Sequence, residues 1–234
     1  MGTTIIEMKN VTKVFPGVTA LKDMSIELIQ GEVHGLVGEN GAGKSTLIRT
    51  LTGAYPIENG QVFLEGKKVC FNSTIEAIEA GISCVYQELN IVKLLSVTDN
   101  IYIGKSIKNS FGLLNRREMD QKTEEVLNSL GIHIDVRREC GKYGLGVQQM
   151  IEIAKSVLFN AKVIIMDEPT SSLGEKEVEQ LFKTVRLLKA QGVTILFVSH
   201  KLEELFELCD RVTVMRDGER VLTDLTGNLN KDKL

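Results

Sequence analysis

Residues 33–45 read VHGLVGENGAGKS, and this stretch decides the fold of the 234-residue chain. The mainly apolar residues 33–37 predict a short strand, and residues 38–45 match G-x-x-x-x-G-K-[ST] before a helical stretch at 45–52. Glycines let the backbone curl until successive N–H groups face inward, where the following helix places its positive end. The unit therefore predicts a triphosphate-binding loop, with Lys44 at the β and γ phosphates and the Ser45 hydroxyl on Mg²⁺.

A second signal lies at residues 163–169, VIIMDEP, where an apolar strand delivers two adjacent carboxylates at its C-terminal end. Asp167 is expected to hold Mg²⁺ through water, and Glu168 to take a proton from the attacking water. Two acids at a strand end can also be simply solvated. The phosphate loop upstream favours the functional interpretation.

Two further polar residues follow apolar segments. His200 comes directly after residues 194–199, and Gln87 comes directly after residues 84–86. Ligands of open α/β sheets gather at the carboxyl ends of the strands, so His200 can donate to the γ phosphate there and Gln87 can face the metal and the water. Taken singly, a histidine at a strand end is usually a polar surface residue, and the glutamine has little specificity.

The composition excludes several classes of protein. Lys and Arg number 28 against 31 Asp and Glu, a formal net charge of −3, so the whole chain is not a polybasic binder of nucleic acid or membranes. The hydrophobic share of 43% is too high for a disordered chain. No apolar run approaches the roughly 20 residues that cross a bilayer. The four cysteines are scattered with no CxxC pair, which indicates buried free thiols in a reducing cytoplasm.

The pattern along the chain predicts an α/β fold with a mostly parallel sheet. Residues 3–9 and 24–30 alternate as in half-buried strands at a sheet edge, and Asn59-Gly60 and Glu65-Gly66 punctuate a third such region, which together predict an N-terminal antiparallel β subdomain. A helical subdomain is expected to be inserted at about residues 100–160. After it, strands alternate with crossover helices, as in a parallel sheet covered on both faces.

The helical elements have specific expected positions. Within the insertion, one helix face is expected to carry Met119, Val126, Leu127 and Leu130. Helices are expected at 147–159 and 176–189, each followed by a strand, at 163–166 and 193–198.

The end of the chain carries two further signals. Residues 212–221 predict a hairpin with Asp217-Gly218 as its turn. Asn230 is a candidate helix N-cap followed by only four residues, too few for a stable helix. We therefore expect the natural chain to continue beyond residue 234, so that residues 1–234 form one domain that precedes a second one.

The phosphate loop, Gln87, the Asp167-Glu168 pair and His200 stand in an order and spacing that resemble the nucleotide-binding domain of ATP-binding cassette (ABC) transporters, over essentially the whole chain. This resemblance implies a P-loop NTPase core that hydrolyses ATP. It also implies that Phe15 stacks on adenine, although core packing is its alternative role. The nucleotide ligands are then expected to be Phe15, Gly38, Asn40, Gly41, Ala42, Gly43, Lys44, Ser45 and Thr46. The expected metal ligands are Ser45, Gln87 and Asp167, and the expected catalytic residues are Glu168, His200 and Gln87.

Several longer segments resemble the N-terminal cassette of bacterial importers for monosaccharides of the ribose, galactose and xylose type. These segments are KVFPGVTALKDMS, YQELNIV, SVTDNIYIG, QQMIEIAKS and DEPTSSL. The resemblance implies a transmembrane sugar permease and a second cassette as partners, a sugar-binding protein as an indirect partner, and no nucleic acid. It also implies a peripheral position on the cytoplasmic face of the membrane.

The chain departs from the family pattern at two places. The usual signature Leu-Ser-x-Gly-Gln aligns with residues 143–147, YGLGV, so Gly144 replaces the serine and Val147 replaces the glutamine. Gly174 stands where many cassettes have Asp. Because the family sandwiches two nucleotides between two cassettes, this signature is expected to serve the partner's site, while Lys44 and Glu168 serve the chain's own site. One competent site per pair of cassettes is the expected result.

The segment 87–104 is too apolar for a free linker, and we expect part of it to receive a coupling helix of the permease, with Leu94, Leu95 and Val97 as candidates. Packing against the helical insertion is the alternative for each. Two alternative functions stay open. One is a nucleotide-dependent regulatory module with little hydrolysis, which the altered signature favours; the other is a soluble, non-transport cassette protein.

Overall fold

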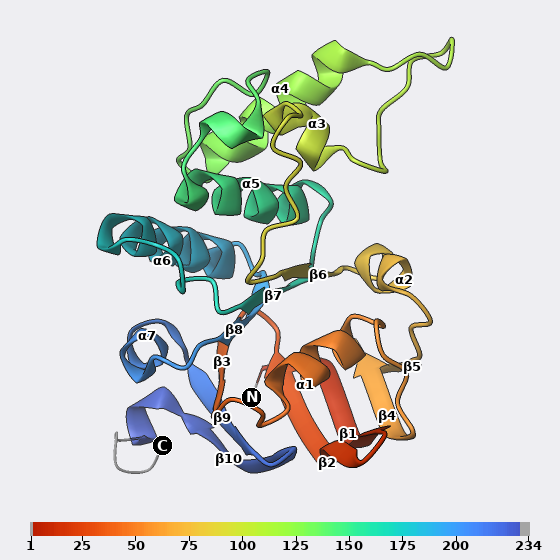
Figure 1. Ribbon diagram of the computed structural model, residues 1–234, viewed down its shortest axis with the longest axis vertical. Coiled ribbons are helices and arrows are strands. Elements are labelled where there is room, and N and C mark those ends of the chain that lie inside the picture. The colour runs from red at the N-terminus through yellow and green to blue at the C-terminus, as the bar shows by residue number, and fades with distance from the viewer. Residues whose placement is uncertain (1, 230–234) are drawn as a thin grey trace. The chain divides into compact units, whose positions relative to one another are not determined.

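The computed structural model describes residues 2–229, and within this range the chain forms two compact units (Figure 1). The first unit is built from the residues up to Cys84, from Lys162–Glu168 and from Leu188 onward. The second is built from Val85–Ala161 and Pro169–Leu187. The candidate helix start at Asn230 lies outside the described residues.

An antiparallel sheet of four strands opens the first unit, as the sequence predicted. Its spatial order is β2-β1-β4-β5. The strands are β1 (Thr4–Phe15), β2 (Val18–Ile29), β4 (Asn59–Leu64) and β5 (Lys67–Val69). The expected edge position is confirmed for β2 and wrong for β1, because β1 pairs with β2 on one side and β4 on the other.

The two turn signals of this sheet had different outcomes. Glu65 and Gly66 have φ values of 50° and 75° and form the turn between β4 and β5. Asn59 and Gly60 instead begin β4, opposite an irregularity in β1. There the backbone is so close that a Cβ atom on Gly60 would lie 2.5 Å from the carbonyl oxygen of Asn10. Glycine is required at position 60 by close approach rather than by a turn.

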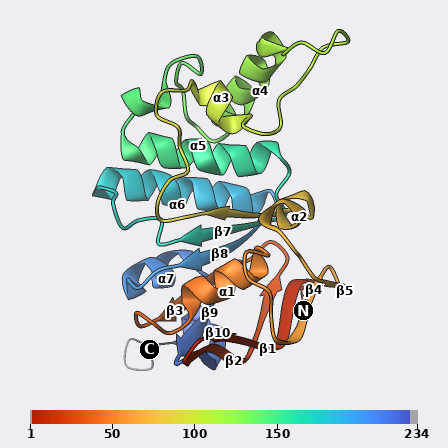
Figure 2. The same ribbon diagram turned by 45° about the vertical axis from the view of Figure 1, so that its right-hand side comes forward.

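The second sheet has six strands in the order β10-β9-β3-β8-β7-β6 (Figure 2). They are β3 (Val33–Gly38), β6 (Ile82–Val85), β7 (Val163–Asp167), β8 (Thr194–Val198), β9 (Arg211–Arg216) and β10 (Glu219–Leu225). The strands β7, β8, β3 and β9 pair in parallel, and β10 pairs antiparallel with β9. The β9–β10 hairpin turns at Asp217-Gly218, as predicted, with both residues at positive φ. This mostly parallel sheet confirms the expected α/β class.

Three helices of the first unit are α1 (Lys44–Leu51), α2 (Thr74–Glu79) and α7 (Leu202–Leu208), followed later by a short 3₁₀ turn at Thr226–Asn228. Both α1 and α7 pack against β3. Gly35 permits the close approach of α7, because a Cβ atom there would lie 3.1 Å from both the Leu205 side chain and the Cys209 sulfur. The central strand is therefore held between helices, with its last residue at the start of the phosphate loop.

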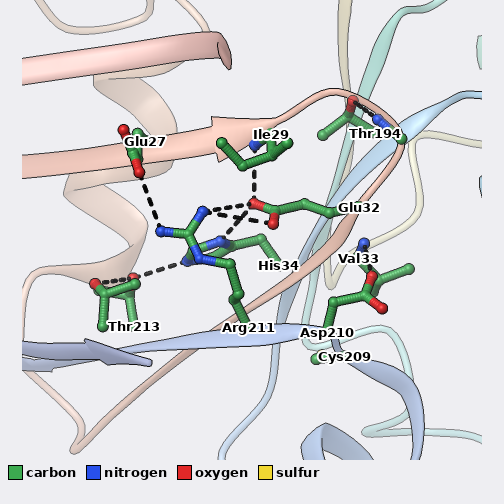
Figure 3. A network of polar contacts seen from close by, with 12 residues as sticks. Glu27, Ile29, Glu32, Val33, His34, Thr194, Cys209, Asp210, Arg211 and Thr213 are labelled. Atoms are coloured by element: carbon green, nitrogen blue, oxygen red, sulfur yellow. Dashed lines mark hydrogen bonds and ion pairs between the residues drawn. The ribbon is translucent and has the colours of Figure 1, made fainter. Parts of the chain in front are cut away.

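A polar network crosses the first unit at the beginning of β3 (Figure 3). The fully buried His34 ring lies 2.9 Å from Oε1 of Glu32 and 2.7 Å from the hydroxyl of Thr213. Arg211 on β9 contacts Glu32 at 3.5 Å and Glu27 on β2 at 3.2 Å. Buried polar groups are tolerated when they are paired in this way, and here the pairs join both sheets of the unit.

The second unit is mainly helical. It contains α3 (Val97–Ile101), α4 (Arg116–Ser129), the 3₁₀ turn Cys140–Lys142, α5 (Leu145–Leu158) and most of α6 (Glu175–Ala190). Met119, Val126, Leu127 and Leu130 are buried along α4 and its C-cap, as the periodicity predicted. Side chains of Ser96 and Asn115 cap α3 and α4. The residues between these helices form a long loop, which the charge pattern of residues 100–139 did not reveal.

Among the described residues, none of the helices has the length and apolarity needed to cross a bilayer. The four cysteines, all within the described residues, form no disulfide bond, and Cys140 and Cys209 are buried. Cys70 is exposed and Cys84 is half-buried, so the expectation of buried thiols is confirmed for Cys140 and Cys209 and wrong for the other two.

Candidate functional site

The loop between β3 and α1 is shaped by glycines. Gly41 and Gly43 have φ values of 89° and 99°, a region that L side chains rarely adopt. A Cβ atom on Gly43 would also lie 2.6 Å from the carbonyl oxygen of Ala20, and one on Gly38 would lie 2.4 Å from that of Met215. The backbone fold of the loop therefore depends on these glycines, and Gly43 is the N-cap of α1 without a side chain to block the N–H groups.

The side chain of Lys44 turns back into this loop. Its Nζ atom donates hydrogen bonds to the carbonyl oxygens of Gly38 at 2.7 Å and Glu39 at 3.1 Å. Lys44 is only 7% exposed. The Lys44 ammonium thus lies at the centre of the curled backbone, beside the N-terminus of α1. Its charge and the positive end of the helix both favour the binding of an anion.

Two carboxylates follow at the end of β7. Burial and the neighbouring Glu168 raise the pKa of Asp167, while Lys44 and Arg49 act in the opposite direction. Glu168 takes a left-handed backbone conformation, with φ at 47°, and its N–H donates to the carbonyl oxygen of Val198 at 3.0 Å. A non-glycine residue held in this region is uncommon and is stabilised here by the neighbouring strand.

His200 completes the cluster from the adjacent strand β8. Its Nδ1 atom lies 3.4 Å from Oε1 of Glu168, and its side chain is 55% exposed. The first unit therefore brings together Lys44, Asp167, Glu168 and His200, as expected for residues at the carboxyl ends of parallel strands. Among the described residues no group of three or more His, Cys, Asp or Glu is arranged to hold a metal ion by itself.

The other candidate ligands surround the loop with different exposure. Asn40, Gly41 and Ser45 are exposed, Thr46 is half-buried and Ala42 is buried. Phe15 is the last residue of β1 and is half-buried. Its ring is edge-on to the ring of Tyr55, with 5.3 Å between the two centroids. Nζ of Lys13 lies 5.2 Å from the centroid of the Phe15 ring. Part of its surface is accessible to a planar ligand. Its role in stacking stays a prediction.

Gln87 and the signature residues belong to the second unit. Gln87 is exposed in a bend after β6. Its role at the metal and the water stays a prediction. Leu94 is 82% exposed and Leu95 37%, but Val97 is fully buried in α3, so Val97 was wrong as a docking residue.

The altered signature surrounds the start of α5. Gly144 is the exposed N-cap of this helix and supplies no side-chain cap. Glu177 accepts hydrogen bonds from the N–H of Gly146 at 3.3 Å and from that of Gly174 at 3.0 Å. One carboxylate thus connects the two segments in which the sequence departs from the family pattern.

Sequence reasoning missed the residues that support the site. Arg49 acts on Asp167, Tyr55 packs on Phe15, and Glu177 joins Gly146 to Gly174. Arg49 could have been found, because it lies on the helix that follows the phosphate loop. Glu177 is one of several acids in α6, and nothing in the sequence distinguishes it.

A glycine loop with a buried lysine joins the central parallel strand to a helix, and two carboxylates end a neighbouring strand. This arrangement defines a P-loop nucleoside triphosphatase fold. The family described as ABC transporter matches residues 21–171, and the chain belongs to that family.

Relatives and solved structures agree with this assignment. The chain is 47% identical over 218 residues to the ribose import ATP-binding protein RbsA of Bacillus licheniformis, covering 93% of this chain and 44% of that protein. It is 45% identical over 234 residues to the galactose/methyl galactoside import ATP-binding protein MglA of Escherichia coli. This match covers 100% of this chain and 46% of that protein. The chain thus spans about half the length of the curated relatives it matches.

Among solved structures, a nucleotide-free ATP-binding cassette from an ABC transporter matches with a TM-score of 0.86 and 28% identity, over 95% of this chain and 91% of that one. The ADP conformation of an ATP-binding cassette of an ABC transporter matches with a TM-score of 0.85 and 26% identity, over 98% of this chain and 92% of that one.

Proposed function

We propose that this chain is an ATP-binding and ATP-hydrolysing cassette that powers the import of a monosaccharide. The observation that carries the proposal is the cluster around Lys44, in which a buried ammonium lies within a curled backbone and acts on the charge of Asp167. The names of relatives that are 45–47% identical, which refer to ribose and galactose import, support the transport role.

ATP fits this cluster through its phosphates. The Lys44 ammonium exchanges its bonds with the Gly38 and Glu39 carbonyl oxygens for bonds to phosphate oxygens, which are charge-assisted and stronger. The N–H groups at the start of α1 surround the same anion. Phe15 offers its face to adenine. Aromatic stacking is tolerant of the base, so most of the affinity comes from the phosphates.

A magnesium ion also fits the donor set. The exposed hydroxyl of Ser45 and the carboxylate of Asp167 are oxygen donors, which magnesium prefers, and phosphate oxygens and water complete such sites. Magnesium held by these residues would supply charge neutralisation at the β and γ phosphates. Magnesium at this site would also counteract the effect of burial and Glu168 on the pKa of Asp167, because it would add a positive charge to those of Lys44 and Arg49.

Hydrolysis then rests on Glu168 and His200. Glu168 takes a proton from the water that attacks the γ phosphate, and His200 holds the carboxylate at one oxygen and donates to the γ phosphate. Gln87 is assigned to the same reaction as a ligand of the metal and of the water. A transmembrane sugar permease, a second cassette and, indirectly, a sugar-binding protein are the proposed partners, at the cytoplasmic face of the membrane.

Calorimetry with Mg-ATP tests the nucleotide site. Lys44→Ala removes the buried cation and should weaken ATP binding by about tenfold to a hundredfold, the range for lost hydrogen bonds to a charged group. Lys67→Ala changes an exposed lysine on β5 and should leave the affinity unchanged. Equal affinities of the two variants would show that the loop does not bind the phosphates.

Transport needs a separate test. The polypeptide should be placed with its permease in vesicles and supplied with ATP, and uptake of ribose and of galactose measured. Uptake of either sugar that depends on Lys44 supports the proposal. ATP binding without uptake of any monosaccharide would leave a nucleotide-binding cassette with another cargo.

A regulatory module with little hydrolysis is the second candidate, and the exposed Gly144 favours it. The position offers a backbone N–H but no hydroxyl to a nucleotide held by a partner cassette. Measuring ATP turnover separately from ATP affinity distinguishes the two functions. Tight binding with no turnover, even beside the second cassette, would support the regulatory role.

A further inference from the structure

The loop between α3 and α4 exposes apolar side chains at its tip. Phe111 is 87% exposed, Leu113 67% and Leu114 53%. Figure 1 shows this segment projecting away from the N-terminal end of α4, within the second unit. Three large apolar side chains within four residues form a patch of the kind that marks a contact surface rather than the isolated exposure that is common on proteins.

The tip is ordered by its own hydrogen bonds. Oδ1 of Asn109 accepts from the N–H groups of Phe111 and Leu113, each at 3.0 Å, and the Asn109 N–H donates to the carbonyl oxygen of Leu113 at 2.8 Å. Gly112, at φ 79°, donates back to the carbonyl oxygen of Asn109 at 2.9 Å. The apolar residues are thus presented on a formed turn, so little conformational entropy is lost when a surface binds them.

The flanks of the tip are basic. From residue 103 to residue 117 the sequence IGKSIKNSFGLLNRR contains four basic residues and no acidic one, within a chain whose net charge is −3. These basic residues are Lys105, Lys108, Arg116 and Arg117, and all four are exposed. Two have local partners: Arg116 pairs with Asp99 at 2.9 Å, and Lys105 lies 4.7 Å from the ring centroid of Phe159. Lys108 and Arg117 supply the remaining positive charge on either side of the tip.

We propose that residues 103–117 bind the anionic headgroup surface of a phospholipid bilayer, with Phe111, Leu113 and Leu114 entering the boundary of the acyl chains. Basic residues that flank a small apolar tip are complementary to such a surface, because the negative headgroups attract the charges while the apolar side chains leave water. Long basic side chains reach the headgroups while the tip lies deeper. This contact needs neither nucleotide nor a partner protein.

Vesicle binding tests the inference without nucleotide, so its result is independent of the proposed ATPase. The purified chain should sediment with vesicles of phosphatidylglycerol mixed with phosphatidylcholine, less with phosphatidylcholine alone, and less in high salt. The double change Lys108→Gln with Arg117→Gln should weaken binding by at least about tenfold. The matched control, Lys67→Gln with Lys68→Gln, removes two exposed charges from β5 and should have no such effect.

A second measurement reports on the tip itself. The chain contains no tryptophan, so Phe111→Trp introduces a single fluorophore. Its emission should shift to shorter wavelength with anionic vesicles and be quenched by brominated lipid, while that of Ile75→Trp, at a 64% exposed position on α2, should not change.

Phe111→Ser with Leu113→Ser should reduce binding by at least about tenfold without changing the thermal unfolding, because both side chains are exposed. Three results would overturn the inference: no binding to anionic vesicles, equal response at positions 111 and 75, or binding only when vesicles contain the permease, which would make the tip a protein contact.

Discussion

Nδ1 of His200 lies 3.4 Å from Oε1 of Glu168, and the two residues follow the adjacent parallel strands β8 and β7. Glu168 is held twice, by this contact and by the bond from its N–H to the carbonyl oxygen of Val198. The carboxylate is only 18% exposed, while the imidazole is more than half exposed. Glu168 is therefore a fixed carboxylate beside an accessible histidine. A substitution at Glu168 is the most direct test of the proposed base.

Glu168→Gln should lower ATP hydrolysis by about 10²-fold or more while ATP binding and the fold are preserved, because the amide keeps the shape and loses the basicity. The measurement is turnover under saturating ATP with the second cassette present, beside ATP affinity by calorimetry. Glu79→Gln, an exposed residue on α2, is the control and should keep full activity. Unchanged turnover in Glu168→Gln would exclude it as the base.

Arg211→Met should lower the free energy of unfolding by about 1.5–3 kcal/mol, because it leaves the buried Glu32 carboxylate without its guanidinium partner. Denaturation in urea measures the change. Arg220→Met, at an exposed position on β10, removes the same kind of charge and should have little effect. If the two variants are equally stable, the network in Figure 3 does not contribute through this ion pair.

Glu152 offers a test of pH dependence in the second unit. It is 8% exposed on α5, and burial raises its pKa from the ordinary value of 4.5, with Lys155 acting in the opposite direction. The folded chain therefore holds this proton more tightly than the unfolded chain, and the stability contributed by Glu152 falls as the pH rises from 4.5 through the raised pKa. Glu152→Gln removes the titration.

The variant should accordingly be more stable than the parent chain at neutral pH, and the difference should shrink as the pH falls through the raised pKa toward 4.5. Unfolding free energies measured across this range provide the comparison. Glu124→Gln, at an exposed position on α4, should follow the parent chain throughout. A constant difference between Glu152→Gln and the parent at every pH would point to packing instead of charge.

Local patterns predicted much of the fold. Strand β3, helix α1 and the β9–β10 hairpin were all evident, because the glycine motif and the Asp217-Gly218 turn leave few other conformations. The position of β1 inside its sheet was not evident. The alternation of apolar and polar residues shows that one face of the strand is buried, but not how many strands pair with it. Only pairing with β4, far along the chain, decides that.

The candidate site was predictable for a different reason. Lys44, Asp167 and His200 follow strands, and parallel strands bring their ends together whatever lies between them. The supporting contact of Glu177 with Gly146 and Gly174 could not be predicted, since it depends on the rotation of α6 about its axis relative to α5. The sequence left open whether Val97 is buried or docks a partner, because a single apolar residue gives no periodicity from which to choose a face.

The altered signature leads to the last prediction. Gly144 has φ at −63°, and a Cβ atom there would lie 3.9 Å from its nearest neighbour, Oε1 of Glu177, so a serine fits without strain. Gly146 differs, because a Cβ atom on it would lie 2.6 Å from the same oxygen. Position 144 is therefore free to vary, whereas a side chain at 146 requires Glu177 to move.

We expect the unmodified chain alone to be mainly monomeric and a slow ATPase, because Gly144 and Val147 offer no side-chain hydrogen bond to a nucleotide across a pair of cassettes. Gly144→Ser with Val147→Gln should raise turnover of the chain alone by about tenfold or more, since one hydrogen bond to a charged group is equivalent to at least that factor. Gly144→Ala with Val147→Leu, which adds bulk but no polar atom, is the matched control and should stay slow. Fast, cooperative hydrolysis by the unmodified chain would contradict this account, because it would mean that two copies close on ATP without the serine and glutamine.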